Sequence, residues 1–128
     1  MPTPEIQEFA KLLVQSVRDA AVKESDLALR PDTTFPKAKR WRALARAATP
    51  EAFAQVIIAD VVDETIFCLL RAIDDGSLKV NFTSSSGKTV DLENEGLSEL
   101  GGWFMGSGGW REQFAKERYV DDFKDLKQ

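Results

Sequence analysis

Histidine is absent from the 128 residues of this chain, and cysteine occurs once, as Cys68. Without histidine, the chain alone cannot form a Ser-His-Asp triad, a Cys-His pair or a histidine-ligated zinc or iron site. One cysteine excludes an internal disulfide and a CxxC site. Cys68 stands in an apolar run, so we interpret it as a small buried hydrophobic residue rather than a nucleophile. These absences favour a non-enzymatic protein without a cofactor.

Long uncharged apolar stretches are also missing. The most apolar stretch, residues 52–73, contains Asp60, Asp63, Glu64 and Arg71, which a membrane span would have to bury at high cost. The polar first residues lack the pattern of a signal peptide. With 43% hydrophobic and 30% charged residues, the composition is typical of one globular domain, residues 1–128. We therefore expect a cytoplasmic protein with no membrane partner.

Proline and glycine are segregated along the chain. All five prolines lie at or before residue 50, and all eight glycines lie at or after residue 76. Hydrophobic periodicity in the first part predicts three helices, over residues 4–23, 36–48 and 50–75, with an irregular connection over residues 24–34. The third helix is apolar over more than half of its circumference, so we expect it to be central and covered on most sides. Ile66 and Leu70 are candidates for full burial.

Two alternating segments, residues 78–82 and 89–92, predict a β-hairpin. Sharing one apolar face requires Phe82 opposite Val90, which leaves residues 85–87 as the turn, with Gly87 in a left-handed conformation. We expect the whole apolar face to pack on the central helix; it comprises Leu78, Val80, Phe82, Val90 and Leu92. Two short helices, residues 97–105 and 110–119, complete a mainly helical α+β fold.

Asp60, Asp63 and Glu64 form an acidic cluster on the central helix. At these spacings three carboxylates can converge on magnesium, which gives one alternative function, a magnesium-dependent hydrolase. No equally clear second acidic motif accompanies the cluster. We therefore favour a solvated stripe that is neutralised by Arg71 or by the basic helix.

The helix over residues 36–48 belongs to a basic segment. Residues 30–46 hold six basic side chains and one acidic one, a local charge of +5 within a chain of net charge −4. A second alternative is therefore a nucleic-acid-associated accessory protein, in which the phosphate contacts come from Lys39, Arg40, Arg42 and Arg46. A pI near 4.9 opposes general affinity for nucleic acid, because long-range repulsion acts against approach to the backbone.

The leading hypothesis is a small acidic protein-binding module, an inhibitor or immunity-type protein that neutralises a basic toxin or nuclease. An acidic surface steers a basic partner during encounter, and aromatic side chains are favoured as anchors in interfaces. The sequence leaves the partner's identity and the oligomeric state open. The predicted partner-binding residues are Asp60, Asp63, Glu64, Glu93, Glu95, Trp103, Phe104, Trp110, Asp121 and Asp122.

Overall fold

The computed structural model describes residues 3–123 and shows a mainly helical α+β fold. Thr3 caps the first helix by accepting a hydrogen bond from the Ile6 amide at 3.2 Å. α1 (Pro4–Leu12), a π-helical stretch η1 (Leu13–Arg18) and α2 (Asp19–Ala28) follow one another without a break. The expected irregular connection from residue 24 is therefore wrong for residues 24–28. The helix continues because Ala28 is buried beside Trp41 in a small apolar cluster, and that long-range contact favours the extra turn.

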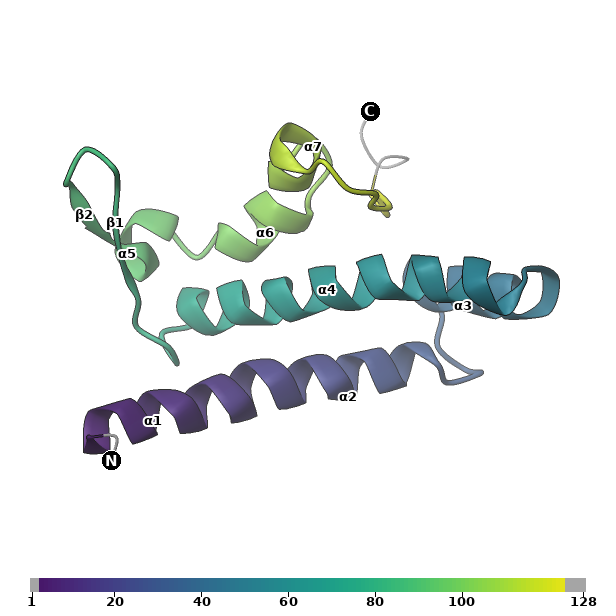
Figure 1. The fold of residues 1–128 in the computed structure, drawn as a ribbon, viewed down its shortest axis with the longest axis horizontal. Coiled ribbons are helices and arrows are strands. Elements are labelled where there is room, and N and C mark those ends of the chain that lie inside the picture. The colour runs from purple at the N-terminus through teal and green to yellow at the C-terminus, as the bar shows by residue number, and fades with distance from the viewer. Residues whose placement is uncertain (1–2, 124–128) are drawn as a thin grey trace.

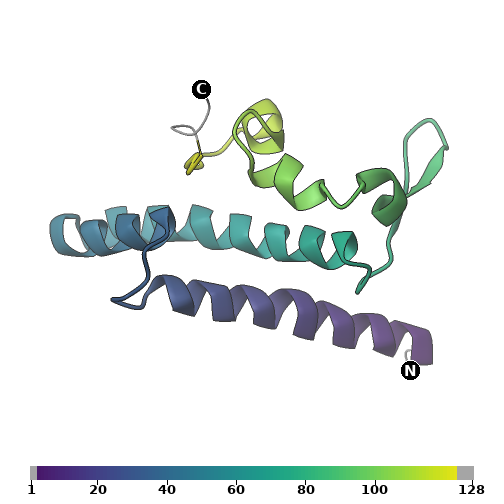
Figure 2. The same ribbon diagram turned by 180° about the vertical axis from the view of Figure 1, so that it is seen from behind.

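The next two helices confirm their predicted positions to within one residue: α3 (Pro36–Ala47) and α4 (Pro50–Asp74). Thr49 caps α4, and Gly76 follows its end with φ +81°, a conformation that glycine adopts without steric cost. α4 lies between the N-terminal helix and the C-terminal helices (Figure 1). α3 lies behind the first half of α4 in Figure 1 and in front of it in Figure 2. α4 is thus the central helix of the fold.

Replacing Thr49 with alanine is expected to lower the free energy of unfolding by about 1 kcal/mol. The Thr49 hydroxyl accepts a hydrogen bond from the Ala52 amide at 3.2 Å, and alanine leaves that amide without its cap. Urea denaturation measures the change as a lower midpoint at constant slope. Thr49→Ser keeps the hydroxyl and serves as the control; an equal loss in both variants would show that the cap is not responsible.

Two apolar clusters form the core. One joins the N-terminal helix, the second half of α4 and the C-terminal part: Val17, Ala21, Cys68, Ala72, Ile73, Leu78 and Leu100. The other joins α2 and α3 to the first half of α4 through Ala28, Ala38 and Trp41. Leu70 is half-buried at the edge of the first cluster, but Ile66 is 38% exposed. α4 is therefore covered on most sides, as predicted, but the expectation of full burial is wrong for both Ile66 and Leu70, because one face of α4 is uncovered.

The hairpin has the predicted register. β1 (Asn81–Thr83) pairs antiparallel with β2 (Thr89–Asp91), which puts Phe82 opposite Val90, and Gly87 has φ +88° in the turn. Its apolar face does not pack on α4 as a whole, however: Phe82 is 56% exposed, and the tip of the hairpin points away from the helices (Figure 1). The reason is α5 (Leu92–Gly96), which begins directly after β2 and contacts α4 in its place.

Three short helices complete the described chain instead of the two predicted: α5, α6 (Leu100–Met105) and α7 (Trp110–Phe114). The last helix was predicted to end at residue 119, but it ends at Phe114, and residues 115–123 contain no helix. Asp74, the last residue of α4, accepts hydrogen bonds from the Leu100 and Gly101 amides at 3.1 and 3.0 Å, which fixes the start of α6 to the end of α4. Within residues 3–123, no helix is both long and apolar enough to cross a bilayer.

The Cys68 thiol is expected to be unreactive toward a thiol reagent at neutral pH until the protein unfolds. It is 1% exposed, and burial, followed by the nearby Glu64 carboxylate, raises its pKa above the ordinary value. Because the unfolded thiol then ionises at a lower pH than the folded one, stability falls as pH rises past the unfolded pKa of about 8.5. Titration with a chromogenic disulfide with and without urea is the measurement. Rapid reaction of the folded protein at pH 7 would contradict the assignment.

Candidate functional site

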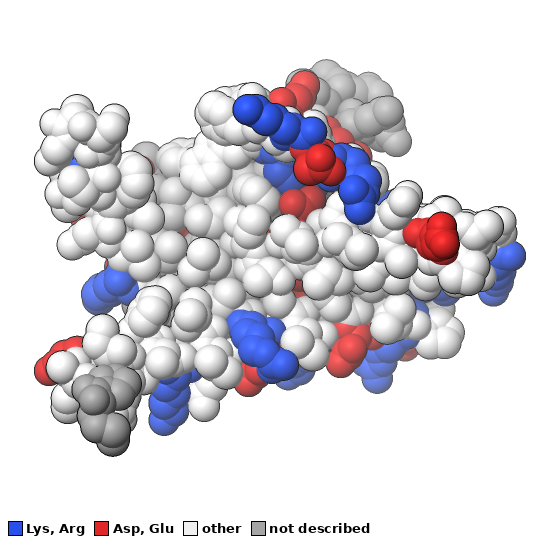
Figure 3. Space-filling model, in the orientation of Figure 1, with Lys and Arg blue, Asp and Glu red and all other residues white. Residues whose placement is uncertain are grey.

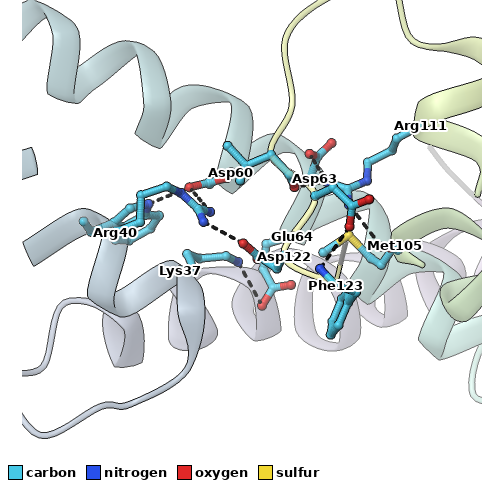
Figure 4. Close-up of polar contacts among 12 residues, drawn as sticks. Lys37, Arg40, Asp60, Asp63, Glu64, Met105, Arg111, Asp122 and Phe123 are labelled. Atoms are coloured by element: carbon cyan, nitrogen blue, oxygen red, sulfur yellow. Dashed lines mark hydrogen bonds and ion pairs between the residues drawn. The ribbon is translucent and has the colours of Figure 1, made fainter. Parts of the chain in front are cut away.

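Asp60 lies in the interior, at 4% exposure. Its Oδ2 accepts hydrogen bonds from Arg40 Nη2 at 2.9 Å and from Trp41 Nε1 at 2.7 Å. A two-residue turn joins α3 to α4, and the two helices lie side by side (Figure 2). Arg40 therefore lies beside Asp60 of α4 (Figure 4), and Trp41 bonds to the same carboxylate. An unpaired carboxylate at this depth would be very costly. Asp60 is therefore a structural residue, and its predicted role in partner binding is wrong.

Arg40 connects three parts of the chain. Its Nη1 donates to Asp122 Oδ1 at 2.6 Å while Nη2 donates to Asp60 (Figure 4). Burial alone would lower the pKa of Arg40, but the hydrogen bonds and negative charges of Asp60 and Asp122 outweigh it and raise the pKa. Two predictions are corrected by this arrangement, because Arg40 is not available to a phosphate and Asp122 is not available to a partner protein.

Asp63, one turn after Asp60 on α4, pairs with α7 instead of α3. Its Oδ2 accepts a hydrogen bond from Arg111 Nη1 at 2.9 Å, and the Arg111 side chain is 6% exposed. Arg111 carries no signal in the sequence, because one arginine in a short polar helix forms no pattern. Its guanidinium group has four further neighbours: the carbonyl oxygens of Met105 and Val120 and the rings of Phe104 and Tyr119.

The third carboxylate of the cluster, Glu64, pairs with Lys37 of α3 at 3.8 Å. Asp60 and Glu64 thus face α3, whereas Asp63 faces α7, so the three carboxylates do not converge. Among residues 3–123, no group of three or more cysteine and acidic side chains is placed to hold a metal ion. The magnesium alternative depended only on the spacing of the three carboxylates along α4. It is contradicted by α3 and α7, which bind these carboxylates separately. The favoured interpretation is confirmed in part: the basic helix neutralises Asp60 and Glu64, but the stripe is not solvated, because both side chains are largely buried.

The remaining basic residues of α3 stay at the surface. Lys39 and Arg46 are exposed, and the half-buried Arg42 donates to the Arg30 carbonyl oxygen at 3.2 Å. Their spacing of three and four residues puts them on one side of the helix. A basic surface of three side chains therefore remains after Arg40 is removed from the predicted set.

Residues 89–110 hold four acidic side chains and no basic one. The local charge of this segment is therefore −4, the same value as the net charge of the whole chain. Asp91 caps α5 by accepting hydrogen bonds from the amides of Glu93 and Asn94. Glu93 is half-buried and pairs with Lys79 at 3.2 Å, whereas Glu95 and Glu99 are exposed. This segment therefore carries negative charge without a basic residue of its own, and other exposed acidic residues, such as Glu5, Glu8, Glu112 and Glu117, lie elsewhere on the surface.

A hollow of about 400 Å³ opens beside α5. Three carboxylates line it, those of Asp74, Asp91 and Glu93, together with Leu97. Leu97 is 71% exposed and has φ +53°, a left-handed conformation that is strained for leucine. Leu97 carries no signal for this conformation in the sequence, because neither its residue type nor its neighbours indicate positive φ. An apolar side chain thus projects beside an acid-lined hollow.

The predicted aromatic anchors divide into exposed and packed residues. Trp103, one turn after Glu99 in α6, is 38% exposed, and its ring lies 6.0 Å from the ring of Trp110. Trp110 packs against the first core cluster, and Phe104 lies half-buried beside Arg111. Trp103 therefore remains as an aromatic residue that a partner can reach.

Asp121 belongs to the internal contacts of the C-terminal segment. Its Oδ2 accepts a hydrogen bond from the Ser107 hydroxyl at 2.9 Å, and its Oδ1 accepts one from the Phe123 amide. Of the ten predicted partner-binding residues, Glu93 and Glu95 lie in α5 and Trp103 lies in α6, and all three are at least partly exposed. We define the α5–α6 surface as Asp91, Glu93, Glu95, Leu97, Glu99 and Trp103.

Comparison of the chain with protein families, curated proteins and solved structures gives no match. The functional argument therefore depends on the geometry of the residues themselves.

Proposed function

We propose that the chain is a small protein-binding module, an inhibitor or immunity-type protein, and that its α5–α6 surface receives a basic partner protein. The observation that supports this proposal is the acid-lined hollow beside α5, with Leu97 projecting next to it. Concentrated negative charge accelerates encounter with a basic protein, such as a nuclease whose active site holds phosphate. Leu97 and Trp103 supply apolar contacts, which acidic side chains alone lack.

The test compares capture by matched variants. The double variant Glu95→Lys, Glu99→Lys reverses charge on the α5–α6 surface. Glu112→Lys, Glu117→Lys makes the same change at two exposed residues outside this surface. We expect the immobilised wild type and the control to retain a basic protein from the source lysate at low salt, and the first variant to lose it. Equal retention by both variants, or no retention by the wild type, would refute the proposal.

Leu97→Asn tests the apolar contribution separately. Asparagine tolerates positive φ better than leucine, so the variant should fold at least as stably as the wild type while it removes the apolar contact. We expect weaker binding of the captured protein with an unchanged dependence on salt. Unchanged affinity would exclude Leu97 from the interface.

Nucleic-acid association is the second candidate, supported by the exposed positions of Lys39 and Arg46 beside Arg42 on α3. Binding of this kind weakens steeply with salt, because released counterions drive it. A mobility-shift titration with DNA and RNA at low salt is the test, with Lys39→Ala, Arg46→Ala as the variant. If neither nucleic acid forms a complex with the wild type, this candidate fails.

A further inference from the structure

One face of α4 has no covering element within residues 3–123. Ile58, Val62 and Ile66 repeat every four residues and are 55%, 53% and 38% exposed. α3 packs on the opposite side, through Asp60 and Glu64. On the side of the molecule away from α3, Figure 3 shows uncharged surface across the middle, with charged side chains gathered above and below it. We call Ile58, Val62 and Ile66 the α4 stripe.

The exposed area of the chain is large for its mass. It amounts to 9030 Å², whereas a folded monomer of 14.3 kDa exposes on average about 6,800 Å². A stable interface covers roughly 800 Å² on each partner. Half of the difference between the observed and the average exposed area is already larger than the roughly 800 Å² that each partner covers. The molecule therefore has enough uncovered surface to form a stable interface in addition to the α5–α6 surface.

The α4 stripe is self-complementary. Ile58 and Ile66 lie four residues on either side of Val62, so two antiparallel copies of α4 that cross at Val62 place each Ile58 against Ile66 of the other copy. Such equivalence is what a two-fold interface requires. The uncharged residues around the stripe are Ala54, Gln55, Ala59 and Thr65. The charged side chains that border its groove are two acidic and two basic, Asp63, Glu117, Arg111 and Arg118, so together they carry no net charge that would repel a second copy.

The surface beside the stripe has the shape that helix packing needs. A groove of about 300 Å³ separates Ile58 and Val62 from the segment of residues 115–119, and Ala59 lies in it. Residues four apart form a ridge, and two such ridges interlock when helices cross at about −50°. The small side chain of Ala59 leaves room for an isoleucine or valine from the opposing ridge.

We propose that a second copy of this chain covers the α4 stripe, in a two-fold dimer in which the α4 helices cross antiparallel at Val62. This dimer is independent of the proposed function, because it uses a different face from the α5–α6 surface. A partner steered by charge would favour charged residues on this face, and the neutral stripe instead fits its own copy.

The first test is the mass in solution. Light scattering after gel filtration and sedimentation equilibrium should give twice 14.3 kDa over roughly 1–100 μM protein. Val62→Glu brings two carboxylates together in the apolar contact, and we expect it to weaken the dimer by roughly 30-fold or more. Leu29→Glu is the control, because Leu29 is 58% exposed and lies in the pocket with Trp41 and Arg42 of α3, on the other side of α4. Circular dichroism checks that both variants fold.

The second test locates the axis. Cys68 is buried, so the cysteine of Val62→Cys is the one that another copy can reach. Mild oxidation of this variant should form a disulfide between two copies through residue 62. Leu29→Cys should stay unlinked under the same conditions. A single-chain mass at every concentration would overturn the proposal and leave the stripe to a different protein. A dimer that survives Val62→Glu, or that Val62→Cys does not link, would overturn the proposed interface.

Discussion

Replacing Asp60 with alanine is expected to lower the free energy of unfolding by about 3–5 kcal/mol. The substitution leaves the Arg40 guanidinium with only Asp122 as a carboxylate partner, and it leaves the buried Trp41 Nε1 without an acceptor. Removing one partner of a buried pair is costly because the desolvated charge that remains has lost its compensation. A domain of this size has roughly 5–15 kcal/mol in total, so much of its stability would be lost.

Urea denaturation followed by circular dichroism measures this loss. Asp19→Ala is the matched control, because Asp19 pairs with Arg18 at 2.7 Å on the surface, with side chains 51% and 70% exposed. Exposed pairs contribute about 0–1 kcal/mol. A loss below 1 kcal/mol for Asp60→Ala would show that the buried contacts among α3, α4 and the C-terminal segment do not hold the fold together.

Replacing Ile73 with alanine is expected to cost about 2–5 kcal/mol, because the side chain is 2% exposed within the first core cluster and its removal leaves a cavity. Ile73 lies where the second half of α4 meets the N-terminal helix, Leu78 and Leu100. The loss should appear as a lower midpoint of urea denaturation at an unchanged slope.

Ile6→Ala removes the same atoms from an exposed position of α1, where the side chain is 55% exposed. Surface substitutions of this kind usually change stability by about 0.5 kcal/mol or less. Similar losses for Ile6→Ala and Ile73→Ala would contradict the position of the core. Ile66 is unsuitable for such a test because it is partly exposed and belongs to the α4 stripe.

Local signals account for the features that were predicted correctly. Thr49 and Pro50 specify the start of α4, and Gly76 marks its end, through contacts made within a few residues. The alternation around Phe82 and Val90 predicts the hairpin register, because it places these two apolar side chains opposite each other on one face of the hairpin. Gly87 then supplies the positive φ of the turn.

The candidate site was predicted less well, because its residues depend on which helices become neighbours. Helical spacing places Asp60, Asp63 and Glu64 close together, but it does not show that α3 and α7 each bring a cation to them. The positive φ of Leu97 belongs to the turn between α5 and α6. After this turn, the amides of Leu100 and Gly101 donate hydrogen bonds to Asp74 of α4. Leucine carries no signal for that conformation.

The sequence by itself determined the absence of histidine chemistry, the helix boundaries set by proline and glycine, and the hairpin register. All of these follow from residue identity or from contacts between residues close in the chain. Only the tertiary structure decided which charges remain available to a partner. Arg40 and Asp60 cancel each other inside the fold, because burying a charge is favourable only with a partner, and that partner is twenty residues away. The same packing left the α4 stripe uncovered.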